Sequence, residues 1–191
     1  IRISPGDVYG FLGPNGAGKT TAIRLILGLI KPDHGAVRIH GETHPVRRLQ
    51  HVGAMVETPS FFDNMTGMEN LQRAFAFAND SSQKNIFSVF EKVGLKERAN
   101  EKVKHYSLGM KQRLGIGRAL LGKPRVLILD EPTNGLDPRG MKEIRDLLVN
   151  LVREDDLTVL ISSHLLSEVE LLCNRIGILD QGKLVAEGTQ A

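Results

Sequence analysis

The chain has 191 residues, of which 41% are hydrophobic and 25% charged, and its formal net charge is +3. No apolar run approaches the roughly 18 residues that a membrane-spanning helix needs, so the sequence predicts a soluble, globular chain with one sizeable core. The 25 lysines and arginines are scattered among 22 acids and there is one cysteine, which favours a solvated surface over a nucleic-acid-binding stripe and excludes an internal disulfide framework.

The first predicted element is a strand from Val8 to Leu12, and a glycine-rich loop follows it and opens a helix near Lys19. This loop is a P-loop motif, because glycines let backbone amides wrap a polyphosphate without obstruction by a Cβ atom. Lys19 is expected to reach the β- and γ-phosphates, Thr20 to bind Mg²⁺, and Thr21 to donate to the α-phosphate. The alternative is an ordinary glycine-rich turn. A chance match to the whole P-loop motif is rare at average amino-acid composition, which disfavours this alternative. The predicted ATP-binding residues are Gly13, Pro14, Asn15, Gly16, Ala17, Gly18, Lys19, Thr20 and Thr21.

Several short elements are predicted after the P-loop. Apolar residues at helical spacing continue the helix over 21–30, and it should end before the turn at 31–35. Short strands are predicted at 36–40 and 52–56, with a short polar helix between them.

The pattern then becomes entirely helical from Thr66 to Leu121, and Thr66 and Glu69 have the spacing of a capping box. The stretches 79–83 and 96–104 are expected to be polar joints of this segment. Strands and helices alternate again in the last third of the chain, which predicts a parallel sheet covered on both faces. The predicted strands are 126–129, 158–161, 176–179 and 183–186, and the predicted helices are 141–153 and 165–172.

The predicted fold is α/β: a P-loop NTPase with a mainly parallel sheet covered by helices, an inserted α-helical subdomain and a small antiparallel β region. We expect one domain over 1–191, with an ATPase core at 1–60 and 122–191 and the helical subdomain at 61–121. The chain starts at Ile1 rather than Met and ends without a stop signal, so we expect a fragment truncated at both ends.

Two adjacent carboxylates, Asp130 and Glu131, follow the strand 126–129. A buried carboxylate is costly without a cation, so Asp130 at a strand end is predicted to hold Mg²⁺ directly or through water. Glu131 should point differently, and its expected role is to orient or deprotonate the attacking water. An Asp-Glu-Pro sequence alone would be assigned to a surface turn, and the P-loop in the same chain changes that interpretation.

The sequence Tyr-Ser-Leu-Gly-Met-Lys-Gln-Arg at 106–113 resembles the signature motif of ABC transporter nucleotide-binding domains. Ser107 and Gly109 keep the family residues, whereas Leu108 and Met110 replace a glycine and a glutamine. Ser107 also precedes a helical run, so it can cap that helix and leave other amides free for an anion. In the family, the signature of one subunit closes on nucleotide held by the other. The resemblance therefore implies a homodimer, or a pair with a related ABC ATPase, around two ATP molecules.

Three further positions match the family. Asp137 in Asn-Gly-Leu-Asp resembles the D-loop aspartate, and His164 after a strand resembles the catalytic switch histidine. A lone histidine after a strand is more often an ordinary surface residue, and its place in the motif series supports the catalytic role. Glu57 stands in place of the Q-loop glutamine, which keeps an oxygen for Mg²⁺ but adds a negative charge. The expected Mg²⁺ ligands are Thr20, Asp130 and Glu57.

The departures at Glu57 and in the signature resemble the bacitracin and lantibiotic export and immunity branch more than nutrient importers. The resemblance implies an ATP-hydrolysing motor subunit that uses Mg²⁺ and drives export of an antibiotic or peptide through a separate membrane permease. Its location would be the cytoplasmic face of the cell membrane, and no nucleic-acid partner is expected. Phe61 and Phe62 would suit a groove for a permease helix, although packing in the core is an equal alternative.

Two other functions are alternatives to transport. A soluble ABC-type ATPase acting on ribosomes or DNA usually joins two cassettes or carries long coiled coils, and neither feature fits this sequence unless it was cut away. A P-loop kinase would need an acceptor pocket, and it would not explain Ser107. The family's adenine-stacking aromatic lies upstream of the P-loop strand, in a portion that we expect the chain to lack.

Overall fold

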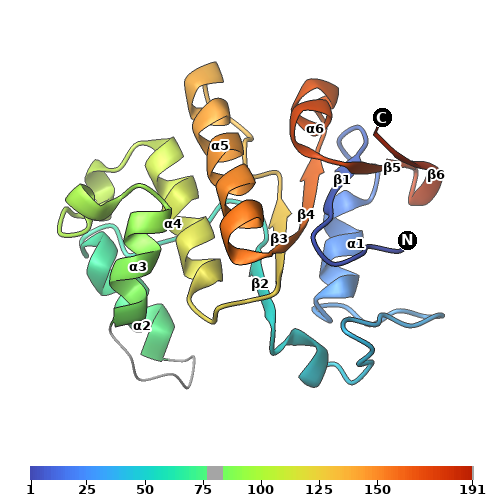
Figure 1. The fold of residues 1–191 in the computed structure, drawn as a ribbon, viewed down its shortest axis with the longest axis horizontal. Helices are drawn as coiled ribbons and strands as arrows, with labels where there is room; N and C mark the ends of the chain where they lie inside the picture. The colour runs from blue at the N-terminus through green and yellow to red at the C-terminus, as the bar shows by residue number, and fades with distance from the viewer. Residues whose placement is uncertain (77–83, 191) are drawn as a thin grey trace.

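The computed structural model describes residues 1–76 and 84–190. Its centre is a six-stranded sheet in the order β2-β3-β4-β1-β5-β6, in which every neighbouring pair is parallel except β5 and β6 (Figure 1). The predicted α/β fold with a mainly parallel sheet is confirmed, and its antiparallel pair lies at one edge. The strands are β1 (Val8–Leu12), β2 (Val52–Met55), β3 (Val126–Asp130), β4 (Thr158–Ser163), β5 (Arg175–Asp180) and β6 (Lys183–Thr189).

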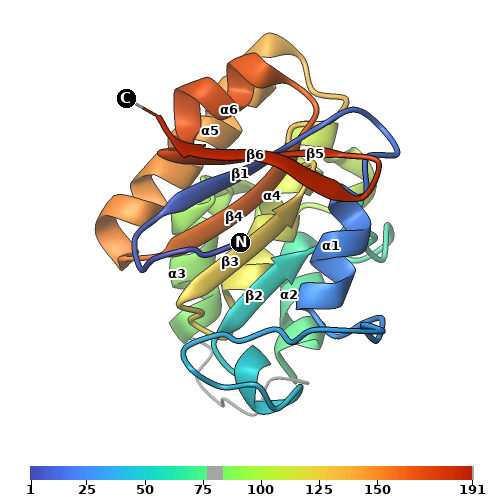
Figure 2. The same ribbon diagram turned by 90° about the vertical axis from the view of Figure 1, so that its right-hand side faces the viewer.

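Helices cover both faces of this sheet, with α1 on one face and α4 to α6 on the other (Figure 2). In the part of the chain that the structure describes, no helix is both long and apolar enough to cross a bilayer. The α-helices are α1 (Lys19–Ile26), α2 (Gly67–Ala76), α3 (Lys84–Lys92), α4 (Leu108–Leu120), α5 (Pro138–Asp155) and α6 (Leu166–Leu172). Single 3₁₀ turns are formed by η1 (Arg47–Leu49), η2 (Lys96–Arg98) and η3 (Val103–His105).

Alternation along the strands divides the core in two. Leu127 and Leu129 of β3 belong to the cluster that includes α4, α5 and α6, whereas Ile128 packs with Ile23 of α1. This division follows from the period of two along a strand, which sends successive side chains to opposite faces. The larger cluster also contains side chains of α2 and α3, so the helical segment shares its core with the sheet. The proposed subdomain boundaries at 61 and 121 stay a prediction.

The helix after the P-loop is shorter than the prediction of 21–30. Gly28 has φ of +70°, and its N–H donates to the Leu25 carbonyl at 3.1 Å. The N–H of Leu29 donates to the Arg24 carbonyl at 2.9 Å. These two bonds make a Schellman motif, in which a left-handed glycine ends the helix and satisfies its last carbonyls. The apolar residues beyond Gly28 lie at helical spacing in the sequence, but they are not part of the helix.

The predicted strand at 36–40 is wrong. This segment forms one isolated bridge, between Ile39 and Glu42, across a turn in which His40 and Gly41 have φ of 49° and 80°. A strand needs a ladder of backbone partners, and a single bridge across a tight turn does not supply one. The short polar helix expected after it is present as the 3₁₀ turn η1.

The helical segment begins as predicted. The Glu69 N–H donates to Thr66 Oγ1 at 3.1 Å, and the Thr66 N–H donates to Glu69 Oε2 at 2.7 Å, which is a reciprocal capping box. The polar joint predicted at 96–104 contains the 3₁₀ turns η2 and η3. The joint predicted at 79–83 lies outside the described residues.

Candidate active site

The P-loop connects β1 to α1 at the carboxyl end of β1. Gly16 and Gly18 have φ of 82° and 102°, values that other residues rarely adopt. Gly18 is the N-cap of α1 and provides no side-chain hydrogen bond, so the amides of the first turn remain available to an anion. A Cβ atom on Gly13 would lie 2.4 Å from the Leu179 carbonyl oxygen, which explains the glycine where the loop passes β5.

Lys19 is buried, with 5% of its surface exposed, and its ammonium lies among oxygen atoms. Nζ donates to the Gly13 carbonyl at 2.7 Å and the Pro14 carbonyl at 3.2 Å, and it lies 3.1 Å from Glu131 Oε1. A buried ammonium requires such partners because its desolvation is expensive. These contacts hold the charge of Lys19 between the P-loop and the end of β3.

The two carboxylates at the end of β3 have different partners. Asp130 is 3% exposed and accepts from Ser162 Oγ at 2.6 Å. Glu131 has φ of 48°, and its backbone N–H donates to the same Ser162 oxygen at 2.9 Å. The Glu131 side chain lies beside Lys19 instead. The two side chains therefore diverge, as their adjacent positions at a strand end predicted.

His164 follows β4 and contacts the second oxygen of Glu131. Its Nδ1 lies 2.8 Å from Glu131 Oε2, and because an ionised carboxylate only accepts, this contact assigns the proton to Nδ1. The structure thus brings together Lys19, Glu131 and His164, which follow three adjacent parallel strands, β1, β3 and β4. Their carboxyl ends meet at one edge of the sheet, the usual ligand site of such folds. The catalytic roles of Glu131 and His164 stay predictions.

Thr20 and Asp130 fit the requirements of Mg²⁺. No Lys, Arg or His within the described ranges is in ion-pair contact with the Asp130 carboxylate, whose protein partner is the Ser162 hydroxyl. Thr20 lies half-buried in the first turn of α1, directly after Lys19. A carboxylate and a hydroxyl, completed by phosphate oxygens and water, are the oxygen ligands that Mg²⁺ prefers.

Glu57 has a different environment from the other two predicted metal ligands. It follows β2 with φ of 61°, and its exposed carboxylate forms an ion pair with Arg24 in the last turn of α1. The structure therefore brings Glu57 to Arg24 rather than to Thr20 and Asp130. Its role as a metal ligand stays a prediction.

The signature residues lie at the start of α4. Ser107 is the N-cap and its Oγ accepts from the Met110 N–H at 3.2 Å, as the sequence predicted. The preceding residue, Tyr106, is buried, and its hydroxyl donates to the Arg98 carbonyl at 2.6 Å. Burial raises the pKa of Tyr106 to about 12, so the hydroxyl keeps its proton to a higher pH than an ordinary tyrosine does. The chain that leads into the signature is thereby anchored.

The signature packs against the D-loop of the same chain. A Cβ atom on Gly109 would lie 3.8 Å from Leu136, and one on Gly135 would lie 3.3 Å from Leu108. Asp137 is the N-cap of α5 and accepts from the Gly140 N–H at 2.9 Å, so α5 begins earlier than its predicted start. Across the described ranges, no hydrogen bond or ion pair joins Ser107 or Gly109 to the P-loop.

Two residues at this site were missed by the sequence analysis, Ser162 and Arg24. The predicted strand stopped at 161, whereas β4 continues through Ser163 and carries Ser162 beside Asp130. A hydroxyl in a fully buried strand needs a partner, and that requirement was the available signal. Arg24 belongs to an amphipathic helix, and its pairing with Glu57 has no local signature.

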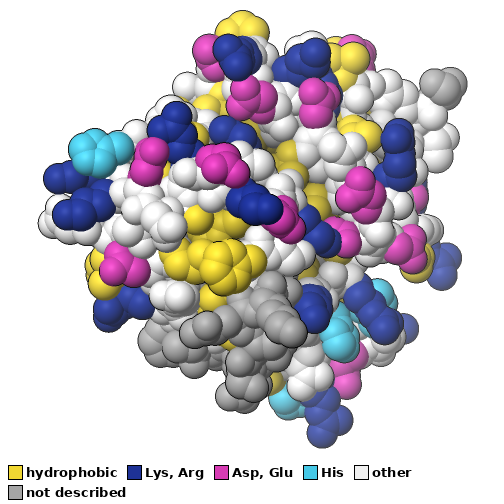
Figure 3. Space-filling model, turned by 60° about the vertical axis from the view of Figure 1, so that its left-hand side comes forward, with side chains coloured by type: hydrophobic (Ala, Val, Ile, Leu, Met, Phe, Trp, Pro, Cys, Tyr) yellow, Lys and Arg dark blue, Asp and Glu magenta, His cyan; other side chains and the backbone are white. Residues whose placement is uncertain are grey.

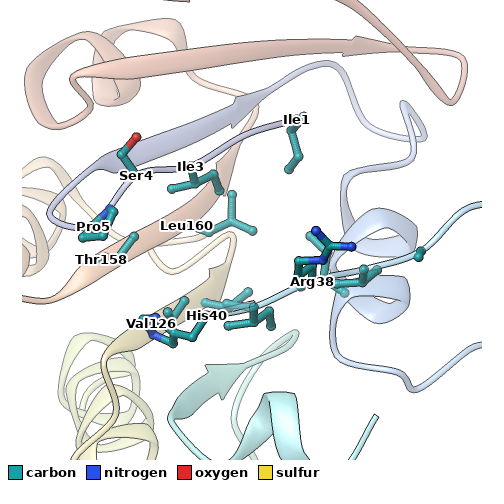
Figure 4. Close-up of a pocket in the computed structure, with 14 residues that line it drawn as sticks. Ile1, Ile3, Ser4, Pro5, Arg38, His40, Val126, Thr158 and Leu160 are labelled. Carbon is teal, nitrogen blue, oxygen red and sulfur yellow. The ribbon is translucent and has the colours of Figure 1, made fainter. Parts of the chain in front are cut away.

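A cavity of about 410 Å³ lies elsewhere in the molecule, between the N-terminal residues, the segment 36–40 and the sheet (Figure 4). Its lining is largely apolar and includes Ile3, Val126 and Leu160. None of the predicted site residues lines it.

Residues 1–134, which contain the P-loop, the signature and the Asp130–Glu131 pair, match the family model described as ABC transporter. The chain belongs to the ABC transporter family. The prediction of this family from the P-loop, signature and D-loop motifs is confirmed.

Two relatives show which branch of the family this chain resembles. The chain is 50% identical over 190 residues to the bacitracin transport ATP-binding protein BcrA of Bacillus licheniformis, covering 98% of this chain and 62% of that protein. It is 40% identical over 187 residues to the lantibiotic transport ATP-binding protein SrtF of Streptococcus pyogenes, covering 98% of this chain and 81% of that protein. The resemblance to the bacitracin and lantibiotic branch is confirmed. The chain spans less than two thirds of the length of BcrA.

A solved structure of the family also matches the fold. The dimeric structure of a post-hydrolysis state of the ATP-binding cassette MJ0796, bound to ADP and Pi, superposes with a TM-score of 0.86 at 26% sequence identity. The match covers 99% of this chain and 88% of that chain. The described sheet and helices are therefore those of an ABC ATPase.

Proposed function

We propose that this chain is the ATP-binding and ATP-hydrolysing part of an ABC transporter, which dimerises around ATP and drives export of an antibiotic or peptide through a separate membrane permease. The observation that carries this proposal is the contact of Glu131 with both Lys19 and His164 beside the P-loop. This arrangement places a cation that can bind phosphate beside a carboxylate that can accept a proton from water.

The proposed mechanism uses an exchange of partners at Lys19. Phosphate oxygens of ATP bind the open amides of the P-loop and compete with Glu131 for the Lys19 ammonium. Glu131 then orients the attacking water and accepts its proton, while His164 Nδ1 keeps the carboxylate in place. Mg²⁺, when held by Thr20 and Asp130, supplies positive charge for the phosphate oxygens.

The proposed dimer follows from the separation of the signature and the P-loop within one chain. Ser107 and Gly109 begin α4 beside the D-loop, and amides at a helix start can bind a phosphate, which in this proposal comes with another subunit. The match to a dimeric cassette bound to ADP and Pi supports this arrangement. We propose a homodimer, with a related ABC ATPase as the alternative partner.

A permease contact is proposed at Phe62. This side chain is 61% exposed, and the Arg73 guanidinium lies 5.2 Å from the centre of its ring. Asn70 holds the Phe62 backbone, accepting from its N–H at 2.9 Å and donating to its carbonyl at 3.1 Å. Phe61 is partly buried against the main core, so core packing accounts for it. Exposed hydrophobic side chains also lie among charged ones on the face in Figure 3.

Export is favoured over action on ribosomes or DNA because BcrA and SrtF are transport ATP-binding proteins. The proposed location is accordingly the cytoplasmic face of the cell membrane, through the permease. The test is ATP hydrolysis by the full-length protein, measured alone and after reconstitution with a candidate membrane permease. We expect the permease and its substrate to change the rate. A rate that responds to ribosomes or DNA and not to the permease would contradict the proposal.

A further inference from the structure

We propose that Ser162 is a positioning residue that fixes Asp130 and Glu131 together, so that metal binding and water activation depend on one hydroxyl. This inference rests on the proposed ATPase function and adds a residue that the family motifs in this sequence did not assign. Ser162 is fully buried at the end of β4, directly opposite Asp130 in the parallel β3–β4 register.

The direction of both hydrogen bonds of Ser162 follows from the donor inventory. The backbone N–H of Glu131 can only donate, so Ser162 Oγ is the acceptor in the 2.9 Å contact. An ionised Asp130 carboxylate can only accept, so the single hydroxyl proton of Ser162 is directed to Oδ1 at 2.6 Å. One hydroxyl therefore connects the two residues with no freedom of orientation left.

The bond to Asp130 orients its carboxylate. Oδ1 is engaged by Ser162, and no other side-chain partner of Asp130 is found in the described part of the chain. A carboxylate held through one oxygen keeps a defined orientation of the other. Ser162 thus prepares Asp130 for a cation without neutralising its charge.

The bond to the Glu131 N–H stabilises an unfavourable backbone conformation at that residue. A left-handed conformation is unfavourable for a residue with a Cβ atom, and Glu131 has φ of 48°. The N–H contact with Ser162 helps to offset this cost and keeps the chain turned at Glu131. That turn sends the Glu131 carboxylate to Lys19 and His164, away from Asp130.

The neighbouring serine has a different task. Ser163 Oγ accepts from the Leu165 N–H at 3.0 Å, just before α6, and its carbonyl accepts from the Gly13 N–H at 3.3 Å. The hydroxyl that bridges the two carboxylate residues is therefore that of Ser162. Thr158, at the opposite end of β4, is also buried, and its Oγ1 accepts from the Gly6 N–H at 3.0 Å. It offers a matched control in the same strand.

The test compares Ser162→Ala, Ser162→Thr and Thr158→Val in the full-length protein. Loss of a residue that supports metal ligands typically costs about 10- to 100-fold in metal affinity or activity, so we expect that range for kcat in Ser162→Ala. We also expect a several-fold higher Mg²⁺ concentration at half-maximal rate. Titration calorimetry should show weaker binding of MgATP and unchanged binding of ATP in EDTA. Ser162→Thr retains the hydroxyl and should restore a large part of the loss.

Thermal melts of all variants separate positioning from general damage. Thr158→Val removes another hydroxyl of a buried residue in the same strand, and we expect a comparable loss of melting temperature with wild-type Mg²⁺ dependence. Wild-type kcat and Mg²⁺ dependence in Ser162→Ala, or the same catalytic loss in Thr158→Val, would overturn the inference. Absence of ATP hydrolysis in the wild type would overturn the proposed function. In that case, weaker Mg²⁺-dependent nucleotide binding by Ser162→Ala would still support the positioning of Asp130.

Discussion

The starts of helices α1 and α4 are both candidate phosphate sites, and they are built differently. The N-cap of α1 is Gly18, with φ of 102° and no side chain, so no side-chain acceptor occupies its first amides. The N-cap of α4 is Ser107, whose hydroxyl accepts from the Met110 N–H at 3.2 Å. The first backbone N–H groups of α1 are left open for a ligand. At the start of α4, a side chain of the same helix start already accepts from one of these groups.

The residues around the two helix starts also differ. The α1 start has the buried ammonium of Lys19 beside it and Glu131 within contact, so one chain supplies the cation, the amides and a carboxylate. The α4 start packs against the D-loop, and no described contact brings a P-loop residue to it. The comparison teaches that a helix terminus becomes a site only when other elements place charge around it. The α4 start is in this sense one half of the proposed shared site.

The largest expected effect is that of Glu131→Gln, which removes the base and keeps the shape of the side chain. We expect ATP binding to persist and kcat to fall by roughly 100-fold or more, because general base catalysis contributes about 10²- to 10⁴-fold. If closure depends on uncleaved ATP, the variant accumulates as a dimer in MgATP and is monomeric in ADP. Phosphate release and sedimentation measure the two effects in the full-length protein. Hydrolysis at the wild-type rate would refute the assignment of Glu131 as base.

Ser107→Arg in the Glu131→Gln background tests the half-site directly. A bulky side chain at Ser107 would occupy the place of the partner's γ-phosphate, so the ATP-dependent dimer should be lost while each monomer still binds MgATP. Dimerisation that is indifferent to nucleotide and to Ser107 would contradict the shared site.

Lys19→Ala should weaken ATP binding strongly, because it removes the cation of the P-loop site. Charge-assisted hydrogen bonds to phosphate contribute about 1.5 to 3 kcal/mol each, which corresponds to at least about a 10-fold loss in affinity for one bond. Isothermal titration with MgATP is the measurement. Lys142→Ala removes the same charge from an exposed position on α5 and is the control. Equal affinities in the Lys19 variant and the wild type would contradict the P-loop assignment.

Ser107→Ala separates the capping role of the serine from its proposed role in the dimer. We expect the free energy of unfolding of the nucleotide-free protein to fall by about 1 kcal/mol, the usual value of an N-cap. Ser107→Asp keeps a side-chain acceptor for the Met110 N–H and should recover stability, but its negative charge should oppose binding of the partner's phosphate. Urea denaturation and sedimentation give the two readouts. Unchanged stability in Ser107→Ala would mean that the cap bond does not stabilise α4.

The smallest expected effect on stability is that of Glu57→Gln. Its ion pair with Arg24 is exposed, so we expect a change below about 1 kcal/mol in the free energy of unfolding. ATP binding should be retained, because glutamine provides the same oxygen, whereas stimulation of the ATPase by the permease should change. ATPase assays with and without permease decide this. An identical permease response in both proteins would remove Glu57 from the mechanism.

Local patterns predicted the fold well where the elements are self-contained. The sequence alone identified three such features, because each depends on residues that are close in the chain. They are the strand-loop-helix of the P-loop, the capping box at Thr66 and the cap at Ser107. The segment 36–40 has the composition of a strand but finds one bridge partner, and that depends on which backbone lies beside it. The early end of α1 could have been predicted from Gly28, a common helix-ending residue.

The sequence by itself determined which chemical groups are present at the strand ends, because the motifs carry the lysine, the carboxylates and the histidine. Only the tertiary structure decided their partners. The strand order β3-β4-β1 places Ser162 between Asp130 and the P-loop, and it gives Glu131 to Lys19 and His164 while Glu57 goes to Arg24. Such pairings join residues that are distant in the chain, and they are set by sheet register and backbone direction, which no local pattern encodes.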